Sequence, residues 1–261
     1  MLLVVGYVVN VGIPHFSYRY KEYSHRCDSR QKAPGKTMRA AVLSDIHSNL
    51  QALEAVLEAA ESAGVDEYWC LGDIVGYGAD PQACVELVSD RFSAVLCGNH
   101  DLAAIGSIPT DVFTQGAAVA ARWTNENLEP HQRTWLAGLS PEGQQAGVGL
   151  YHGSPRDPVW EYVMSSLAAE LCFDDAKRPL ILVGHSHVAL AFSRRPGEPA
   201  TGETRKAGTV LDLRGAEWIL NPGSVGQPRD NDPRAAWLLL DASEGTAEYR
   251  REDYDIQAAQ E

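Results

Sequence analysis

The chain has 261 residues, of which 44% are hydrophobic and 22% are charged, so it is long enough for one sizeable domain with a buried core. Its formal net charge of −13 argues against a nucleic-acid backbone or an anionic membrane as the default partner. An anionic substrate would require a local reversal of charge, which a bound cation can supply.

The five cysteines form no CxxC pair and follow no regular spacing. Cys70 and Cys97 lie within the apolar runs WCLG and VLCG, where a free thiol behaves as a small hydrophobic side chain. A disulfide framework is therefore not expected, and the sequence predicts a reducing, cytoplasmic location.

Residues 1–37 differ from the rest of the chain in composition. The opening MLLVVGYVVNVGIP is shorter than the roughly 20 residues of a membrane span, and it lacks the flanks of a signal peptide. The charged residues that follow within this segment are mainly basic. Residues 38–261 alone therefore carry a formal net charge of −17. Two interpretations are open: a weak membrane or partner anchor, or a poorly ordered leader before a domain that begins at Met38. We take the leader as the prediction.

From Arg39 onward, short apolar runs alternate with polar loops and helical patterns. The stretch 49–64 places apolar residues on one helical face and ends at Gly64, and Asp80 followed by Pro81 begins a second helix. This alternation predicts a largely parallel, buried sheet. Its first strands are expected at 40–43, 68–71 and 94–97.

Residues 102–147 interrupt the alternation. Their prolines and an Ala-rich stretch predict two or three short helices that form a cap insertion. After them a helix is expected over 160–172 and a long polar hairpin over 194–216. Further strands are expected at 148–151 and 180–183, followed by antiparallel strands at 188–192, 218–220, 235–240 and 247–250.

Polar side chains follow five of these apolar runs, and five of the eight histidines are among them. Because the carboxyl ends of strands in an α/β sheet share one edge, these groups are expected to converge. Imidazoles, carboxylates and an amide oxygen without cysteine suit manganese, iron or zinc in a hydrolytic site. The residues are Asp45, His47, Asp73, Asn99, His100, His152, His185 and His187.

Each part of this pattern is weak alone, since D-x-H, GD and a histidine after a strand also occur in ordinary turns. Taken in order, however, the motifs SDIH, LGD, GNHD, YHG and GHSH resemble those of the calcineurin-like metallophosphoesterases. The resemblance spans about residues 39–241. The short spacings and the segment NPGSVGQPRD at 221–230 are most similar to the small bacterial phosphodiesterase-like branch.

The resemblance implies an α/β fold, a four-layer α-β-β-α sandwich of two mixed sheets, formed by one domain over 38–261. It also implies two divalent metal ions, with manganese expected first and iron, nickel or zinc as alternatives. Asp73 would bridge both ions. Asp45, His47 and His187 would hold one ion, and Asn99, His152 and His185 the other.

The resemblance makes His100 a catalytic residue that faces the leaving group and protonates the departing alkoxide. Protein phosphatases of the family carry an orienting aspartate at the position of Gly76. Asp101 is therefore a second catalytic candidate that could orient His100, unless the backbone alone does so. Candidate substrate contacts are Ser154, Arg156 and Arg229, which ordinary loop chemistry and surface charge would explain equally well.

The main functional hypothesis is a phosphoesterase that hydrolyses small phosphodiesters or phosphomonoesters through a metal-bridging hydroxide. The alternative is a non-catalytic protein-binding scaffold on the same fold. A nuclease for polymeric DNA or RNA would need a basic surface that the acidic domain does not supply, so no nucleic-acid or membrane partner is expected. The sequence does not indicate the oligomeric state or the physiological substrate.

Overall fold

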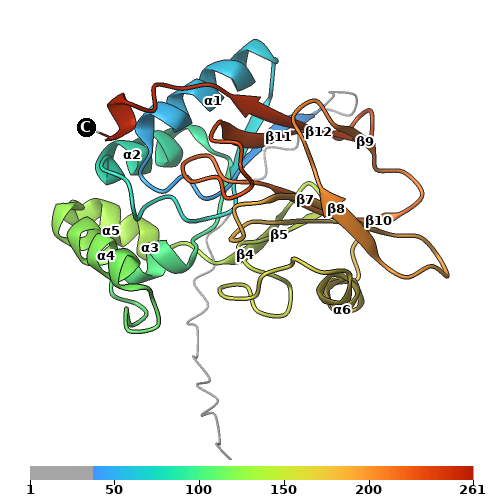
Figure 1. Ribbon diagram of the computed structural model, residues 1–261, viewed down its shortest axis with the longest axis horizontal. Coiled ribbons are helices and arrows are strands. Elements are labelled where there is room, and N and C mark those ends of the chain that lie inside the picture. Colours follow the sequence, from blue (N-terminus) through green and yellow to red (C-terminus); the bar gives the residue numbers. More distant parts are fainter. Residues whose placement is uncertain (1–37, 261) are drawn as a thin grey trace, which may run out of the picture. The chain divides into compact units, whose positions relative to one another are not determined.

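The computed structural model describes residues 38–260, and the leader predicted for residues 1–37 lies outside this range. Within it, two six-stranded sheets pack face to face, and helices cover their outer faces (Figure 1). The predicted four-layer α/β sandwich is therefore confirmed.

The first sheet has the strand order β3-β2-β1-β11-β12-β9. Its β1, β2 and β3 are parallel, whereas β11, β12 and β9 add antiparallel pairs, so the sheet is mixed. The strands are β1 (Arg39–Leu43), β2 (Glu67–Cys70), β3 (Ala94–Val95), β9 (Val210–Asp212), β11 (Ala235–Asp241) and β12 (Thr246–Glu252).

The second sheet has the order β4-β5-β6-β10-β7-β8 and is also mixed. Its β10 pairs parallel with β6 and antiparallel with β7, so the later strands are not all antiparallel as expected. The strands are β4 (Glu142–Gln145), β5 (Val148–Tyr151), β6 (Leu180–Val183), β7 (Ala189–Arg194), β8 (Thr201–Thr204) and β10 (Glu217–Pro222).

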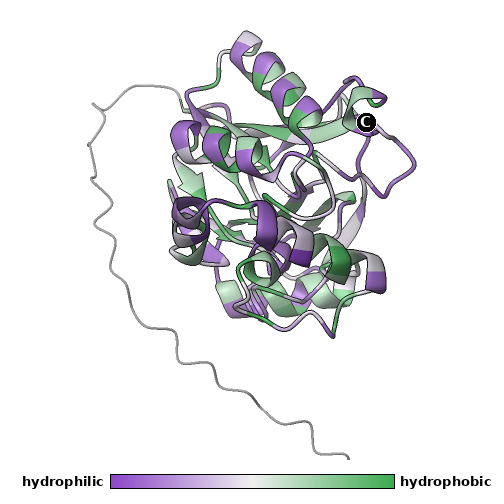
Figure 2. Ribbon diagram, turned by 90° about the vertical axis from the view of Figure 1, so that its left-hand side faces the viewer, coloured by the Kyte–Doolittle hydropathy of each residue, from purple (hydrophilic) through white to green (hydrophobic). Residues whose placement is uncertain are grey.

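Side chains alternate between two cores along each strand. In β1, Ala40 and Val42 face the opposite sheet, whereas Ala41 and Leu43 face α1 (Leu50–Ser62) and α2 (Pro81–Arg91). A third core lies between the second sheet and α6 (Ser166–Ala176). In Figure 2 the surface helices carry both hydrophilic and hydrophobic residues, as helices that cover a sheet must.

The segment predicted as a cap insertion contains α4 (Gln115–Asn127) and α5 (Pro130–Ala137), which follow α3 (Asn99–Ala104). The prediction of short helices over 102–147 holds, but the end of this segment forms β4, a polar edge strand that the sequence pattern missed. The hairpin expected over 194–216 ends at β8, and β9 crosses to the first sheet. A 3₁₀ helix, Ala258–Gln260, ends the described chain.

The helix predicted over 160–172 is α6, and it begins later than expected. The Ser165 side chain caps α6 by accepting a hydrogen bond from the backbone N–H of Ala168 (3.2 Å), so residues 160–164 remain in the loop. Cys70, Cys84, Cys97 and Cys172 are all buried and free. Across residues 38–260, every helix is too short or too polar to cross a membrane.

Candidate metal centre

The segments that follow β1, β2, β3, β5 and β6 meet at one edge of the sandwich and carry the predicted site residues, and after β3 these residues form the first turn of α3. Several of these residues adopt the left-handed backbone conformation, which is rare for residues other than glycine. Their φ angles lie between 51° and 64°, at Asp45, His47, Asp73, His185 and His187. Such strain is kept where a function requires a particular side-chain direction.

Hydrogen bonds between loops hold this backbone in place. The Asp45 N–H donates to the Gly72 carbonyl (3.0 Å), and the His185 N–H donates to the Asp45 carboxylate (3.1 Å). The Ser224 hydroxyl donates to the Asp45 carbonyl (2.7 Å). The segment NPGSVGQPRD, which the sequence analysis singled out, therefore braces the first loop from the opposite sheet.

Gly98 allows the loops to approach each other closely. A Cβ at this position would lie 2.1 Å from Oδ1 of Asp73 and 2.6 Å from Cε1 of His152, far inside contact distance. Only glycine leaves the space that both side chains occupy. The glycine of the GNHD motif is thus needed for packing at the site.

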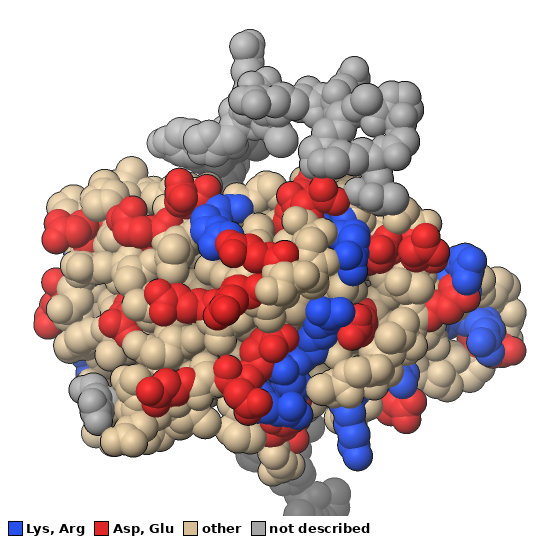
Figure 3. Space-filling view, turned by 90° about the horizontal axis from the view of Figure 1, so that it is seen from above, with Lys and Arg blue, Asp and Glu red and all other residues tan. Residues whose placement is uncertain are grey.

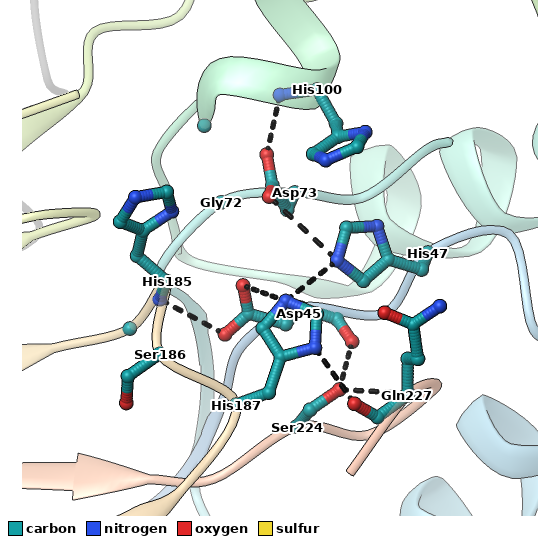
Figure 4. A network of polar contacts seen from close by, with 12 residues as sticks. Asp45, His47, Gly72, Asp73, His100, His185, Ser186, His187, Ser224 and Gln227 are labelled. Atoms are coloured by element: carbon teal, nitrogen blue, oxygen red, sulfur yellow. Dashed lines mark hydrogen bonds and ion pairs between the residues drawn. The ribbon is translucent and has the colours of Figure 1, made fainter. Parts of the chain in front are cut away.

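The first group of potential ligands consists of Asp45, His47, Asp73 and His187, all buried (Figure 4). Nε2 of His47 lies 3.1 Å from Nε2 of His187 and 3.7 Å from Oδ2 of Asp73. Nε2 of His187 lies 3.4 Å from Oδ1 of Asp45. Four donor atoms therefore point at one small volume.

The second group consists of Asp73, His152 and His185, so Asp73 belongs to both groups. Nε2 of His152 lies 3.5 Å from Oδ2 of Asp73 and 3.1 Å from Oδ1 of Asn99. All seven predicted ligands thus come together. The sequence-based division into two sets that share Asp73 agrees with these distances, although the assignment of ligands to ions stays a prediction.

The tautomer of each histidine follows from the hydrogen-bond partner of its Nδ1 atom. Nδ1 of His47 lies 3.2 Å from the Val75 carbonyl, and Nδ1 of His187 lies 2.7 Å from the Gln227 carbonyl. A carbonyl only accepts hydrogen bonds, so both Nδ1 atoms carry the proton and both Nε2 atoms carry a lone pair. Two lone pairs 3.1 Å apart repel each other unless a cation lies between them.

The other two histidines are oriented in the same way. Nδ1 of His152 lies 2.9 Å from the Leu71 carbonyl, and the backbone of Trp160 hydrogen bonds the His185 ring. Nε2 of His185 is buried and has no partner. Backbone carbonyls of this kind fix the direction and the basicity of metal-binding imidazoles.

Burial makes the cluster unfavourable without added positive charge. It raises the pKa of Asp73 well above its ordinary value and the pKa of Asp45 to about 7. Burial also lowers the pKa of His47 well below its usual range and the pKa values of His152, His185 and His187 to about 3. The imidazoles are therefore in the neutral form that binds metals.

Two buried carboxylate oxygens also favour a bound cation. Oδ1 of Asp45 and Oδ2 of Asp73 are buried and have no hydrogen-bond partner. Buried acceptors of this kind are costly unless a donor or a cation satisfies them. The donor set of carboxylates, imidazoles and an amide oxygen fits divalent metal ions such as manganese, iron, nickel or zinc.

His100 lies beside the ligand cluster but belongs to neither ligand group. Its ring centroid is 4.9 Å from that of His47, 4.5 Å from Tyr77 and 5.0 Å from Phe113, so aromatic packing orients it. A Cβ at Gly76 would lie 2.8 Å from Nδ1 of His100. The ring thus crowds the position at which protein phosphatases carry the orienting aspartate.

The expectation that Asp101 orients His100 is wrong. Its two carboxylate oxygens accept hydrogen bonds from the backbone N–H groups of Val75 and Gly98, both at 2.9 Å, and Nδ1 of His100 has no partner. Burial raises the pKa of Asp101 to about 6, and these backbone donors limit the rise. Asp101 is a clamp between the GDIV and GNHD loops.

Two of the three candidate substrate contacts interact with other residues of the loop after β5. The buried Ser154 hydroxyl donates to Glu161 and accepts from the Arg156 N–H (3.1 Å), and the Arg156 guanidinium pairs with Glu161 at 3.1 Å. Arg229 is exposed, and its charge lowers the pKa of Asp45. All three residues stay predicted contacts for a substrate phosphate.

Sequence reasoning missed the aromatic residues around the site. Tyr162 stacks on the His185 ring with centroids 4.0 Å apart and planes inclined by 9°. Phe113 packs against both His100 and Trp160. In the sequence these aromatic residues lie in segments that show neither helical nor strand periodicity. An apolar side chain in such a segment is equally typical of the hydrophobic core.

Comparison with known proteins identifies the family. The sequence model of one protein family, the calcineurin-like phosphoesterase superfamily domain, matches residues 38–245 of this chain. The chain belongs to this superfamily. Like its relatives, it therefore has the fold of a phosphoesterase, and the Asp and His cluster is its candidate metal site.

Individual relatives agree with this assignment. The chain is 38% identical to a metallophosphoesterase from Sphaerobacter thermophilus, whose crystal structure superimposes with a TM-score of 0.77 over 86% of this chain and 92% of that one. It is 36% identical over 229 residues to an uncharacterized protein of Methanocaldococcus jannaschii, covering 85% of this chain and 90% of the relative. A hypothetical protein from Pyrococcus horikoshii, 20% identical with a TM-score of 0.68 over 85% of this chain and 91% of that one, shares the fold.

The clamp formed by Asp101 is tested by the substitution Asp101→Asn. Asparagine keeps one acceptor oxygen but turns an amide N–H₂ toward a backbone N–H, so the free energy of unfolding of the metal-free protein should fall by about 1.5–3 kcal/mol. Urea denaturation measures this change. Asp90→Asn, on the exposed side of α2, is the matched control and should stay within about 0.5 kcal/mol of wild type. An equally small effect of Asp101→Asn would contradict the clamp.

Proposed function

We propose that the protein is a dinuclear metal-dependent phosphoesterase that hydrolyses small phosphodiesters or phosphomonoesters. The observation that carries this proposal is the shared Asp73 carboxylate, whose unpartnered Oδ2 lies 3.7 Å from Nε2 of His47 and 3.5 Å from Nε2 of His152. Lone pairs on both sides of one carboxylate suit a bridging ligand between two cations.

In this proposal Asp45, His47 and His187 hold one ion, Asn99, His152 and His185 hold the other, and Asp73 contacts both. When bound, two divalent cations would polarise the phosphoryl oxygens and lower the pKa of a coordinated water. Manganese suits the mixture of oxygen and nitrogen donors, as do iron, nickel and zinc.

The charge of the protein supports a site of this kind. The whole chain carries −13, and on the face drawn in Figure 3 acidic and basic side chains are intermixed without a broad basic surface. Long-range attraction for a polyanion is therefore weak, and the local charge must come from the bound cations and Arg229. A small phosphate ester fits these conditions better than a nucleic acid.

His100 is proposed to act on the leaving group. Its ring lies next to His47, is held by Tyr77 and Phe113, and is left free of metal in the proposed ligand sets. From this position it can donate a hydrogen bond to the ester oxygen as negative charge develops there. We place this chemistry in the cytoplasm because all four described cysteines are free thiols.

The substitution Asp73→Asn tests the bridging role. Asparagine can still accept the 2.8 Å hydrogen bond from the His100 N–H, and it removes a buried carboxylate, so the metal-free variant should fold at least as stably as wild type. Manganese in about 100-fold excess over Kd should raise the Tm of wild type by roughly 5–10 °C. The variant should lose most of that increase and at least about 100-fold in turnover of an aryl phosphodiester.

Differential scanning fluorimetry with and without manganese measures the increase in Tm, and Asp90→Asn, which should keep it, is the control. If Asp73→Asn responds to manganese as wild type does, Asp73 is no metal ligand and the proposed bridge does not exist.

The substitution His100→Ala separates catalysis from metal binding. Loss of a proton donor should lower turnover of the same diester by about 10²–10⁴-fold, because general acid catalysis contributes that much. The increase in Tm with manganese should persist. Spectrophotometric assays compare this variant with His131→Ala, which removes an exposed imidazole on α5. Turnover close to wild type would exclude His100 from the reaction.

A further inference from the structure

Aromatic side chains surround the mouth of the candidate metal centre. Among residues 38–260, four aromatic residues have exposed side chains, and three of them belong to this group: Tyr77 (37% exposed), Trp160 (39%) and Tyr162 (47%). The fourth, Trp123, lies on the cap helix α4. With the partly buried Phe113, the three form what we call the aromatic rim.

The rim is built from three separate parts of the chain. Tyr77 follows β2, Phe113 belongs to the cap insertion, and Trp160 and Tyr162 lie in the loop between β5 and α6. Although these residues are far apart in sequence, each packs against His100, His185 or another ring of the rim. Exposed aromatic surface gathered at one place usually marks a binding site.

The rim contacts the site residues on two sides. Tyr77 and Phe113 pack against His100 with ring centroids at 4.5 and 5.0 Å, and Trp160 packs against Phe113 at 5.6 Å. On the other side, Tyr162 stacks on His185 at 4.0 Å. The Trp160 backbone also hydrogen bonds His185. A group attached to a phosphate beside His100 and His185 would therefore lie close to these rings.

We propose that the aromatic rim binds a planar aromatic group carried by the substrate, so that the preferred substrates are phosphoesters of nucleoside type. This inference rests on the proposed phosphoesterase function and specifies its substrate class. A nucleobase stacks on an aromatic ring through its π-face and needs no charge from the protein. The net charge of −13 disfavours a long polyanion, so we expect a substrate of mononucleotide or dinucleotide size.

Binding to the manganese-loaded protein, measured by rapid mixing before the ligand is hydrolysed, tests the proposal. Adenosine 5′-monophosphate and ribose 5-phosphate share the phosphate and the sugar and differ in the base. Wild type should bind the nucleotide at least about tenfold more tightly. Trp160→Ala and Tyr162→Ala should each lower nucleotide affinity by roughly tenfold and leave ribose 5-phosphate within about twofold.

Two control variants distinguish stacking from general damage. Trp160→Phe keeps a π-face and should retain most of the nucleotide affinity, whereas Trp123→Ala removes an equally large, equally exposed side chain and should change neither ligand. Equal affinities of wild type for the two ligands would overturn the proposal, as would equal losses for both ligands in the rim variants.

Failure of the rim and failure of the proposed function are separate outcomes. If the protein hydrolyses phosphoesters but does not discriminate between the two ligands, only the substrate class is wrong. If it hydrolyses none of a panel of aryl and nucleoside esters with any of the four metals but still prefers the nucleotide, the rim binds bases and the phosphoesterase proposal is wrong.

Discussion

The site depends on one arrangement: buried imidazoles whose Nδ1 atoms donate to backbone carbonyls and whose Nε2 lone pairs face buried carboxylates. His47, His152 and His187 each follow this pattern, with carbonyl partners at 2.7–3.2 Å. Because each carbonyl keeps the proton on Nδ1, the lone pair on Nε2 cannot be removed by shifting the proton to that nitrogen. A cluster of buried, unpaired acceptors costs free energy that bound cations would recover.

The rest of the fold stabilises this arrangement, although the backbone of the site residues is strained. Five site residues adopt left-handed backbone conformations, and the loops that carry them are tied together by backbone hydrogen bonds. Asp101 joins two loops, Ser224 supports a third from the opposite sheet, and Gly98 gives the room they need. The two packed sheets provide the rigid base to which these loops are attached.

The sequence predicted most of the strands, and the residues that gather at the candidate metal centre, because both leave direct marks: apolar runs, and polar motifs directly after them. It misplaced the start of α6, since the largely apolar segment WEYVM at 160–164 favours a helix, whereas the structure exposes Trp160 and Tyr162 at the rim. It missed β4, a polar edge strand with no apolar pattern. The role of Asp101 was misjudged because neighbours in sequence, Asp101 and His100, point to different partners, which only the three-dimensional contacts reveal.

Anomalous diffraction from crystals grown with manganese would show the proposed dinuclear centre itself. We expect two peaks: one bounded by Asp45, His47 and His187, the other by Asn99, His152 and His185, with Asp73 contacting both. A single peak, no peak within the cluster, or a second ion that does not contact Asp73 would contradict the dinuclear centre on which the proposed function rests.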